Sequence, residues 1–430
     1  MRSVCIPVFL CIILIIVANF SVHGAGFSVY EQGATATGMA GAFAAKADDA
    51  TAVFYNPAGI SQLEGTHLSV GLTWIPPETE MTDPYGGTWE TESQDFLVPN
   101  LYLTHGFNDT VAIGLGIYAP FGLGMDWTKD DDWIYRYLVK DVSVESMYVN
   151  PVISFSLNEN WSVAAGAIWV ASDVEYVAAV DMTPVEIALS EAMGMDFTLP
   201  DSELRLEGDN ENGDWGYSLA IHGTINRFHL GLAYRSAVEC GYIGDATFDV
   251  PASGYGSTVD GLINGFFPDT QGTTSIEMPA SIQLGLGYDV TDAFYVEFDV
   301  LWHGWSSYKS LDIDFEEPSL TDVQQTKDWD DVMSYRLGLY YQMTDQAAIF
   351  GGYYFDETPI PDRTLDPILP GADRNSFQVG ASYDFGGLKL EGSYMALLFD
   401  DRETTTNYRD VNGKYESSTH IFSAQVSYSF

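Results

Sequence analysis

Three shortages narrow what this sequence can be before any motif is considered. The 430 residues include only three cysteines, and 17 Lys and Arg stand against 61 Asp and Glu, which gives a formal net charge of −44. So acidic a surface repels phosphate backbones, which excludes nucleic acid as a partner. After the first 20 residues the chain also has no long apolar run, so no transmembrane helix is expected there.

The first residues have the layout of a secretory signal peptide. A basic start is followed by an apolar run from Ile6 to Phe20 and then by small residues up to Gly24. The run is shorter than the ~20 apolar residues that a membrane-spanning helix needs. We therefore expect residues 1–24 to be a signal peptide that is cleaved after Gly24. Two cysteines lie in this segment, so Cys240 alone remains and no intrachain disulfide is expected.

The rest of the chain alternates apolar and polar residues in many short segments. In Ile421–Phe430, for example, Phe422 and Val426 fall on one face while Ser423 and Ser427 fall on the other. A transmembrane β-strand requires this period of two, with apolar side chains toward lipid and polar ones toward the lumen. A soluble sandwich also alternates, but it does not need aromatic residues at both ends of so many strands.

About fourteen such segments occur, and an even number is expected of a bacterial outer-membrane barrel. They start near residues 65, 96, 110, 142, 161, 215, 228, 279, 294, 332, 347, 376, 388 and 419. Short connections alternate with long ones, as short periplasmic turns alternate with long outer loops in such barrels. We therefore predict an all-β fold, with residues 64–430 forming an antiparallel transmembrane β-barrel of about 14 strands.

Residues 25–63 do not follow this rhythm. The stretch is rich in Gly and Ala and has neither a helical stripe nor a sustained alternation. Irregular backbone is tolerated at membrane depth only when it is buried in protein or lines a watery cavity. Pro57 cannot donate a backbone hydrogen bond, and it biases Asn56 away from helix. We therefore predict that residues 25–63 form a plug, or hatch, in the barrel lumen.

Two of the long connections contain apolar residues that a water-facing loop does not need. They are Pro184–Phe197, which we expect to form a short amphipathic helix, and Thr258–Phe267. Apolar patches on a surface usually mark binding sites, and methionine suits variable apolar ligands. The alternative is that the two loops only pack on each other and cap the barrel. The candidate ligand-binding residues are Ile187, Leu189, Met193, Leu262, Ile263, Phe266 and Phe267.

The third predicted strand ends in glycines that surround a proline, between Gly114 and Gly124. Proline removes a ladder hydrogen bond, and glycines mark bulges or bends. Pro120 and Gly122 therefore indicate either a strand that passes into a loop or a kink that opens the barrel wall. Sequence alone favours the loop.

No catalytic or metal-binding motif is visible. The six histidines after the signal segment are scattered without metal-ligand spacing, and no nucleophile motif indicates an outer-membrane lipase. The acidic run Asp312–Glu317 lacks the spaced, glycine-containing pattern of a calcium loop. We therefore expect no enzyme activity, no metal and no cofactor.

Several short motifs follow one another in a fixed order along the chain. They are Ala25–Phe27, Ala47–Ala50, Asn56–Gly59, Tyr118–Gly122, Gly213–Tyr217, Leu232–Ser236, Trp302–Ser306, Tyr335-Arg336 and Asp356–Asp362. In this order they resemble the FadL family of outer-membrane transporters of long-chain fatty acids, whose TodX-like branch carries aromatic hydrocarbons. The resemblance covers nearly all of the mature chain. It implies a monomeric, plugged, fourteen-stranded barrel surrounded by the lipid and lipopolysaccharide of a Gram-negative outer membrane.

The resemblance also implies a route for passive transport without a cofactor. An apolar ligand would be caught in the groove between the two outer loops and pass to an internal apolar pocket at Phe27. It would leave sideways into the bilayer through a kink at Pro120 and Gly122. The hatch would rearrange during release, and the family pattern places this movement at three residues, Asn56, Pro57 and Ala58.

The ligand is a long-chain fatty acid in the favoured interpretation and an aromatic hydrocarbon of the TodX type in the alternative. A lipase and a nonspecific porin are disfavoured. Family members that carry fatty acids place basic side chains near the carboxylate, and Lys327 or Arg336 is the candidate here. The residues after Lys327, Asp328–Asp331, are mostly acidic. A buried carboxylate without a partner is costly, so a neutral ligand is the second possibility.

Overall fold

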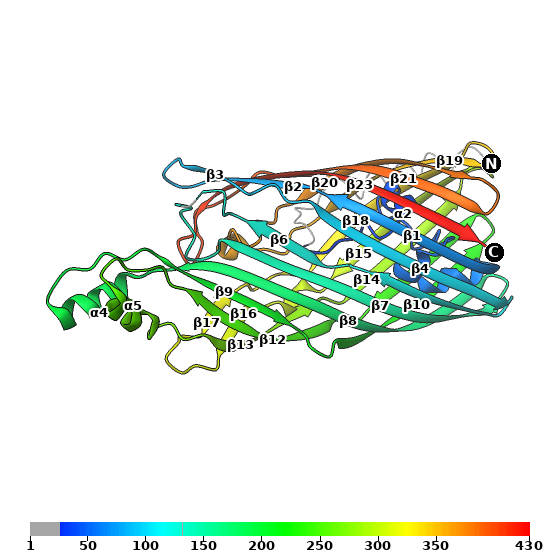
Figure 1. Ribbon diagram of the computed structural model, residues 1–430. Helices are drawn as coiled ribbons and strands as arrows, with labels where there is room; N and C mark the ends of the chain where they lie inside the picture. Colours follow the sequence, from blue (N-terminus) through cyan, green and yellow to red (C-terminus); the bar gives the residue numbers. More distant parts are fainter. Residues whose placement is uncertain (1–25, 131) are drawn as a thin grey trace.

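Fourteen antiparallel strands close into a β-barrel in the computed structural model, which describes residues 26–130 and 132–430 (Figure 1). The wall strands, in chain order, are β1 (Gly65–Ile75), β4 (Phe96–Asn108), β5 (Val111–Tyr118), β7 (Asp141–Asn158), β8 (Trp161–Val180), β10 (Asp214–Ile225), β11 (Phe228–Arg235), β14 (Ser281–Asp289), β15 (Phe294–His303), β18 (Val332–Gln342), β19 (Ala347–Asp356), β20 (Arg374–Asp384), β21 (Leu388–Phe399) and β23 (Gly413–Ser429). The predicted all-β barrel is confirmed. The predicted signal peptide, residues 1–24, lies outside the described residues.

The first and last wall strands pair with each other and so leave no free edge. In this β1–β23 pair Val70 lies opposite Val426. Alternation decides which side chains face outward, because successive side chains of a strand point to opposite faces. On β20, for instance, Phe377 and Val379 are exposed on the outside while Gln378 between them is buried. No helix among the described residues is long and apolar enough to cross a membrane.

The outer half of the wall is longer than a bilayer requires. β7 has 18 residues and β8 has 20, whereas a transmembrane strand needs about 9–11. Further strands lengthen this half or fold back over it: β2 (Pro77–Thr82), β3 (Thr88–Glu90), β6 (Gly122–Asp126), β9 (Ser202–Asp209), β12 (Val238–Asp249), β13 (Thr270–Met278), β16 (Ser310–Phe315), β17 (Val323–Thr326) and β22 (Arg402–Thr404). Much of what the sequence suggested as outer loops is therefore β-sheet.

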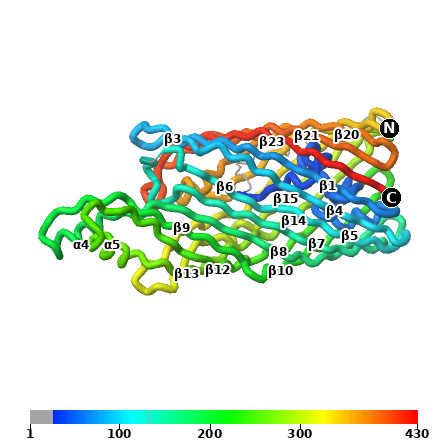
Figure 2. Tube along the Cα trace, viewed as in Figure 1, coloured from blue at the N-terminus to red at the C-terminus, as the bar shows by residue number. Residues whose placement is uncertain are grey.

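Two helices lie at the far end of this extension, away from the carboxyl terminus (Figures 1 and 2). They are α4 (Thr183–Met193) and α5 (Ser257–Asn264). The helix expected within Pro184–Phe197 is thus present, and it ends at Gly194, whose backbone is left-handed. Two short 3₁₀ turns, η2 (Trp305–Ser307) and η3 (Asp362–Thr364), complete the outer connections.

The segment before the first wall strand lies inside the barrel, near the end that holds the carboxyl terminus (Figure 1). Its short elements are α2 (Ala34–Gly38), α3 (Ala52–Tyr55) and η1 (Pro57–Gln62). α2 packs against β19, β20, β21 and β23, while η1 packs against the opposite wall at β5, β7, β8 and β10. Nearly every residue between them is buried. We call the described part of this segment, residues 26–63, the plug.

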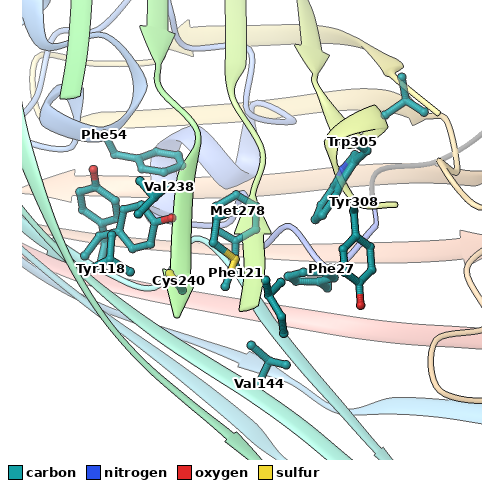
Figure 3. Packing of buried hydrophobic residues seen from close by; sticks show 14 of the residues in the cluster. Phe27, Phe54, Tyr118, Phe121, Val144, Val238, Cys240, Met278, Trp305 and Tyr308 are labelled. Carbon is teal, nitrogen blue, oxygen red and sulfur yellow. The ribbon is translucent and has the colours of Figure 1, made fainter. Parts of the chain in front are cut away.

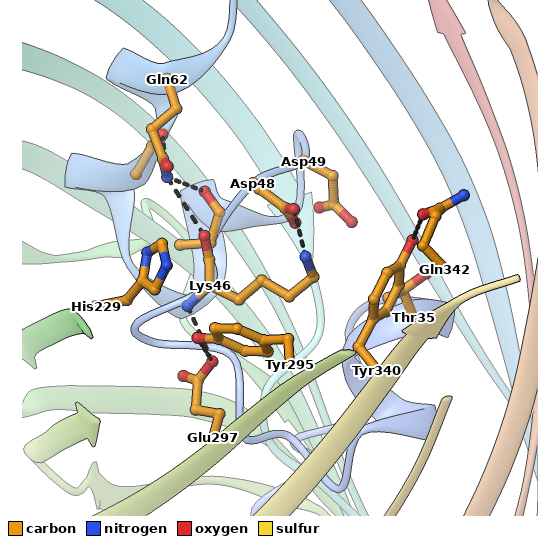
Figure 4. A network of polar contacts seen from close by, with 12 residues as sticks. Thr35, Lys46, Asp48, Asp49, Gln62, His229, Tyr295, Glu297, Tyr340 and Gln342 are labelled. Carbon is orange, nitrogen blue, oxygen red and sulfur yellow. Dashed lines mark hydrogen bonds and ion pairs between the residues drawn. The ribbon is translucent and has the colours of Figure 1, made fainter. Parts of the chain in front are cut away.

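Polar side chains of the wall satisfy the irregular backbone of the plug (Figure 4). Glu297 on β15 accepts hydrogen bonds from the backbone N–H groups of Ala45 at 2.6 Å and Lys46 at 2.9 Å. Asp299 accepts from the two preceding N–H groups at 3.2 and 3.1 Å. His222 Nε2 lies 2.9 Å from the carbonyl oxygen of Ala45. Buried backbone groups need such partners, so the polar lumen holds the plug in one position.

Candidate functional site

A cavity of about 820 Å³ lies between the start of the plug and the wall formed by β4, β5 and β6. Most of its lining surface is apolar, but polar residues also border it, including the acids Glu31, Glu78, Asp95, Glu145 and Asp173. The plug contributes Phe27 and Val29, β4 contributes Val98, and the later strands contribute Leu397 and Ile421. A concave, mainly apolar site of about 300–1,000 Å³ with a few polar groups is typical of small-molecule binding.

The barrel wall is interrupted beside this cavity. The pairing of β4 with β5 stops at Leu101 opposite Ile117. β5 ends at Tyr118, and the strand resumes as β6, which pairs with β7 from Gly122 opposite Glu145. In the described chain no ladder joins β6 to residues 96–100 of β4. At this point the strand stays paired with β7 on one side and loses β4 on the other. The residues alone favoured a strand that passes into a loop, whereas the family resemblance implied a kink at Pro120 and Gly122.

Side chains from both faces of the wall line the cavity, which therefore runs through this interruption. Leu97 on β4 is 60% exposed and Met147 on β7 is 44% exposed, both on the outer surface. They line the same cavity as Phe27 and Glu31 of the plug, which lie inside. We call the interruption between β4 and β6 the lateral gap.

The start of the plug is hydrogen-bonded to the kink that borders the gap. Val29 N–H donates to the carbonyl of Pro120 at 2.8 Å, and Gly122 N–H donates to the carbonyl of Phe27 at 3.1 Å. The Gln32 side chain donates to the carbonyl of Ala119 at 2.7 Å. Pro120 breaks the wall because it has no N–H to donate. The carbonyl of Pro120 accepts a hydrogen bond from the plug. The plug therefore takes the place of the strand partner that the chain lacks at this kink.

Phe27 lies in a cluster of aromatic rings (Figure 3), and it lines three cavities. Its ring centroid is 4.7 Å from that of Trp305 and 6.0 Å from those of Phe121 and Trp329. It lines the large cavity and two smaller ones of about 90 and 20 Å³ on the outer side. Only Leu123 of β6 shares this position among the residues that line these cavities.

The two basic residues predicted to receive a carboxylate are buried, and each is paired with an acid of the chain itself. Lys327 Nζ lies 2.9 Å from Asp366, beside the smallest cavity. Arg336 lies 3.2 Å from Asp356 and also donates to the carbonyl of Ala40 in the plug at 3.0 Å. Neither positive charge is left without a partner.

A third basic residue, Arg374 at the start of β20, was missed in the sequence although it lines the large cavity. Glu31 of the plug lines the same space. Burial raises the pKa of the Glu31 carboxyl above its ordinary value, and the charges of Arg374 and Arg336 oppose this rise. The signal for Arg374 was present, because alternation places it on the polar, inward face of β20 with Ser376 and Gln378.

The predicted groove residues are divided between two environments at the tips of the outer extension. Leu189 of α4 is 4% exposed and Ile263 of α5 is 1% exposed, and they share one small apolar cluster. This is the packing that the capping alternative required, and Phe267 is partly buried against it. The exposed members of the set are Ile187, Met193, Leu262 and Phe266.

The turn that was expected to move during release is tightly held. The side-chain nitrogen Nδ2 of Asn56 donates to the carbonyls of Ala44 at 2.7 Å and Ile221 at 3.1 Å, and the side-chain oxygen Oδ1 accepts from Ala58 N–H at 3.1 Å. The carbonyl of Ala58 accepts from Ser162 at 2.8 Å. Pro57 opens η1 from this turn.

Comparison with known proteins agrees with this architecture. Residues 15–430 match the family described as "Outer membrane protein transport protein (OMPP1/FadL/TodX)". The 47 kDa outer membrane protein of Pasteurella multocida is 25% identical over 418 residues, with 95% of each chain covered. The long-chain fatty acid transport protein of Escherichia coli O6:H1 is 24% identical over 440 residues, with 94% of each chain covered.

Solved structures show the same fold. A Pseudomonas aeruginosa FadL homologue superposes with a TM-score of 0.81 at 21% identity, covering 94% of this chain and 100% of the other. The toluene transporter TodX of Pseudomonas putida gives a TM-score of 0.67 at 16% identity, covering 89% of this chain and 94% of the other. The match over nearly the whole chain, together with the plugged fourteen-stranded barrel, leads to one conclusion. The protein belongs to the OMPP1/FadL/TodX family of outer-membrane transport proteins, which are channels and not enzymes.

Proposed function

We propose that the protein carries long-chain fatty acids passively across the outer membrane and releases them sideways into the bilayer. The observation that carries this proposal is the large cavity, which begins beside Phe27 and continues through the lateral gap. Its volume of about 820 Å³ lies within the range of small-molecule sites. A ligand that leaves through the wall enters lipid directly, so its apolar chain does not have to cross the periplasmic water.

In this proposal the exposed apolar residues of α4 and α5 capture the ligand outside the membrane. The ligand then passes the aromatic cluster at Phe27 and enters the large cavity. The hydrogen bonds between Val29 and Pro120 and between Gly122 and Phe27 join the plug to the kink. Displacement of Phe27 would therefore also disturb the edge of the lateral gap. No energy source beyond removal of the ligand on the inner side is needed.

An aromatic hydrocarbon is the second candidate, and the pairing of the basic residues favours it. Lys327 and Arg336 each form a salt bridge with an acid of the chain. A neutral ligand needs no counter-charge, whereas a buried carboxylate without one is costly. Relatives with both kinds of named ligand, long-chain fatty acids and toluene, have been identified.

Calorimetric titration of the detergent-solubilised protein separates the two candidates. Oleate and toluene are the probes, with detergent-matched blanks. The proposal predicts saturable oleate binding that Lys327→Ala or Arg336→Ala alters and that Arg227→Ala, on an exposed inner turn, leaves unchanged. Binding of toluene alone would assign the protein to hydrocarbon transport. Binding of neither compound would refute the proposed ligand class.

A further inference from the structure

Two carboxylates without a basic partner lie side by side behind the plug. Glu297 and Asp299 on β15 are both fully buried. A Cβ built on Gly285 of β14 would lie 2.7 Å from Asp299 Oδ1 and 3.0 Å from Glu297 Oε1, so these two oxygens flank one point of the lumen. The two carboxyl groups are also within hydrogen-bonding distance of each other. In the described chain no side-chain nitrogen of Lys, Arg or His lies within 4.0 Å of either carboxylate.

Hydrogen-bond donors occupy all but one of the carboxylate oxygens. The backbone N–H groups of plug residues 43–46 donate to both oxygens of Glu297 and to Asp299 Oδ2. The Tyr295 hydroxyl donates to Glu297 Oε2 at 2.6 Å, and Gln283 Nε2 donates to Asp299 Oδ2 at 2.6 Å. Asp299 Oδ1 is buried and has no hydrogen-bond partner among the described residues. A buried polar atom without a partner is uncommon, because it has lost its hydrogen bonds to water.

A proton on Asp299 Oδ1 would satisfy both the geometry and the charge. Two carboxylates that share one buried site do not both ionise readily, because like charges repel strongly where water does not screen them. Protonated Asp299 Oδ1 donates to Glu297 Oε1, which removes one of the two negative charges and fills the one vacant position. Glu297 is the poorer place for the proton, since both of its oxygens already accept hydrogen bonds from the plug.

The charged groups around the pair are engaged elsewhere. Arg336 on β18 lies opposite Asp299 in register, but it forms its salt bridge with Asp356 at 3.2 Å. Lys46 donates its backbone N–H to the pair, while its Nζ lies 2.5 Å from Asp48. The remaining titratable side chains that face this region of the plug and β15 are Tyr30, Tyr295, His222 and His229.

We propose that Glu297 and Asp299 bind one shared proton, carried by Asp299 Oδ1, and that this proton sets how firmly the barrel holds plug residues 43–46. When this segment moves away, water reaches the two carboxyl groups and the proton passes to solvent, because an exposed carboxyl is ionised at neutral pH. The state that binds the extra proton becomes less favourable as the pH rises. The plug is therefore held most firmly in mild acid and less firmly in mild alkali. The inference goes beyond the proposed function and does not depend on which ligand is carried.

Hydrogen exchange of the detergent-solubilised full chain tests the shared proton. Mass spectrometry follows peptides that cover residues 43–46 between about pH 6 and about pH 9, where an exposed carboxyl stays ionised. After correction for the base catalysis of exchange itself, the protection of these amides is expected to fall by up to about tenfold for each pH unit. The amide of Thr37 in α2 is the internal control, because it donates at 2.8 Å to a neutral acceptor, the carbonyl of Gly33.

Two isosteric amides are expected to behave in opposite ways. In Asp299→Asn the amide oxygen keeps the donors of Oδ2, and the amide nitrogen donates to Glu297 in place of the shared proton. Protection of residues 43–46 should then persist and no longer depend on pH. In Glu297→Gln the amide nitrogen faces a plug N–H group or the Tyr295 hydroxyl, so protection should be lost over the whole pH range. If the two acids were only structural, both variants would lose protection alike.

Several outcomes would overturn the proposal. The shared proton is refuted if protection in the unaltered protein does not change with pH. It is refuted equally if Asp299→Asn keeps the pH dependence, which would then belong to His222 or His229, or if this variant does not fold. Protection that follows the concentration of sodium or potassium at constant pH would assign the site to a cation and would also refute the proton.

Discussion

Asn56 joins three parts of the molecule through one side chain. It bonds to the plug at Ala44, to β10 at Ile221 and to η1 at Ala58. It is fully buried, so water cannot replace any of these hydrogen bonds when the side chain is removed. A rearrangement of the plug at this turn would have to break all three together.

The substitution Asn56→Ala is therefore expected to lower the free energy of unfolding by about 1–3 kcal/mol, the cost of leaving buried polar groups without partners. The temperature at which the folded barrel loses its fast migration in electrophoresis measures this loss. Asn108→Ala is the control, because Asn108 caps an exposed inner turn. Equal effects of the two substitutions would show that the Asn56 turn does not secure the plug.

At the residue scale, the sequence identified candidate site residues but not the residues with which they pair. It placed Phe27 at an internal apolar pocket, and in the structure Phe27 lines three cavities. It did not show that Lys327 and Arg336 are paired, because Asp366 and Asp356 come from other parts of the barrel. Pairing across strands depends on register, which the alternation of a single strand does not determine.

At the scale of elements, α4 and α5 pack against each other through some apolar side chains and expose other apolar side chains on their surface. Leu189 and Ile263 hold the two helices together. Met193 and Leu262 on the same helices are exposed and contribute little to that packing. Capture of ligand and stability of the tip should therefore be separable.

The double substitution Met193→Ser with Leu262→Ser is expected to slow the uptake of oleate at low concentration without changing thermal stability. Ile263→Ala should instead loosen the tip, because truncation of a buried Ile costs about 2–5 kcal/mol. Limited proteolysis of the outer connections and uptake by whole cells measure the two effects. Unchanged uptake with the double substitution would indicate that the helices only cap the barrel.

The inner turns and the wall strands could be predicted because lipid on one side and polar lumen on the other impose a strict alternation. That constraint ends at the membrane surface. β9, for example, runs Ser202–Asp209 and alternates charged residues on one face with Leu204 and Leu206 on the other. It lies within a long hydrophilic connection, so the sequence analysis assigned it to an outer loop. β6 was missed for a different reason, since the glycines around Pro120 indicate a bend without revealing that pairing with β7 resumes.

At the scale of the whole molecule, the plug and the lateral gap both bear on the path that a ligand can take through the barrel. The plug lies inside the barrel at the inner end and is bonded to the wall on several sides. The lateral gap interrupts the wall beside the same interior, and in the proposed function it is the exit toward lipid. The arrangement favours a compound that is more stable in the bilayer than in water.

Uptake of radiolabelled oleate by cells that produce the variant Gly122→Phe tests the lateral route most directly. A Cβ at Gly122 meets no atom closer than 3.8 Å, and Gly122 lines the large cavity, so we expect the new ring to enter the cavity beside the gap. Gly241→Phe is the matched control, since a Cβ at Gly241 meets nothing within 4 Å and faces solvent on β12. We predict that Gly122→Phe reduces uptake to near background while Gly241→Phe does not. Full uptake by folded Gly122→Phe protein would contradict lateral exit.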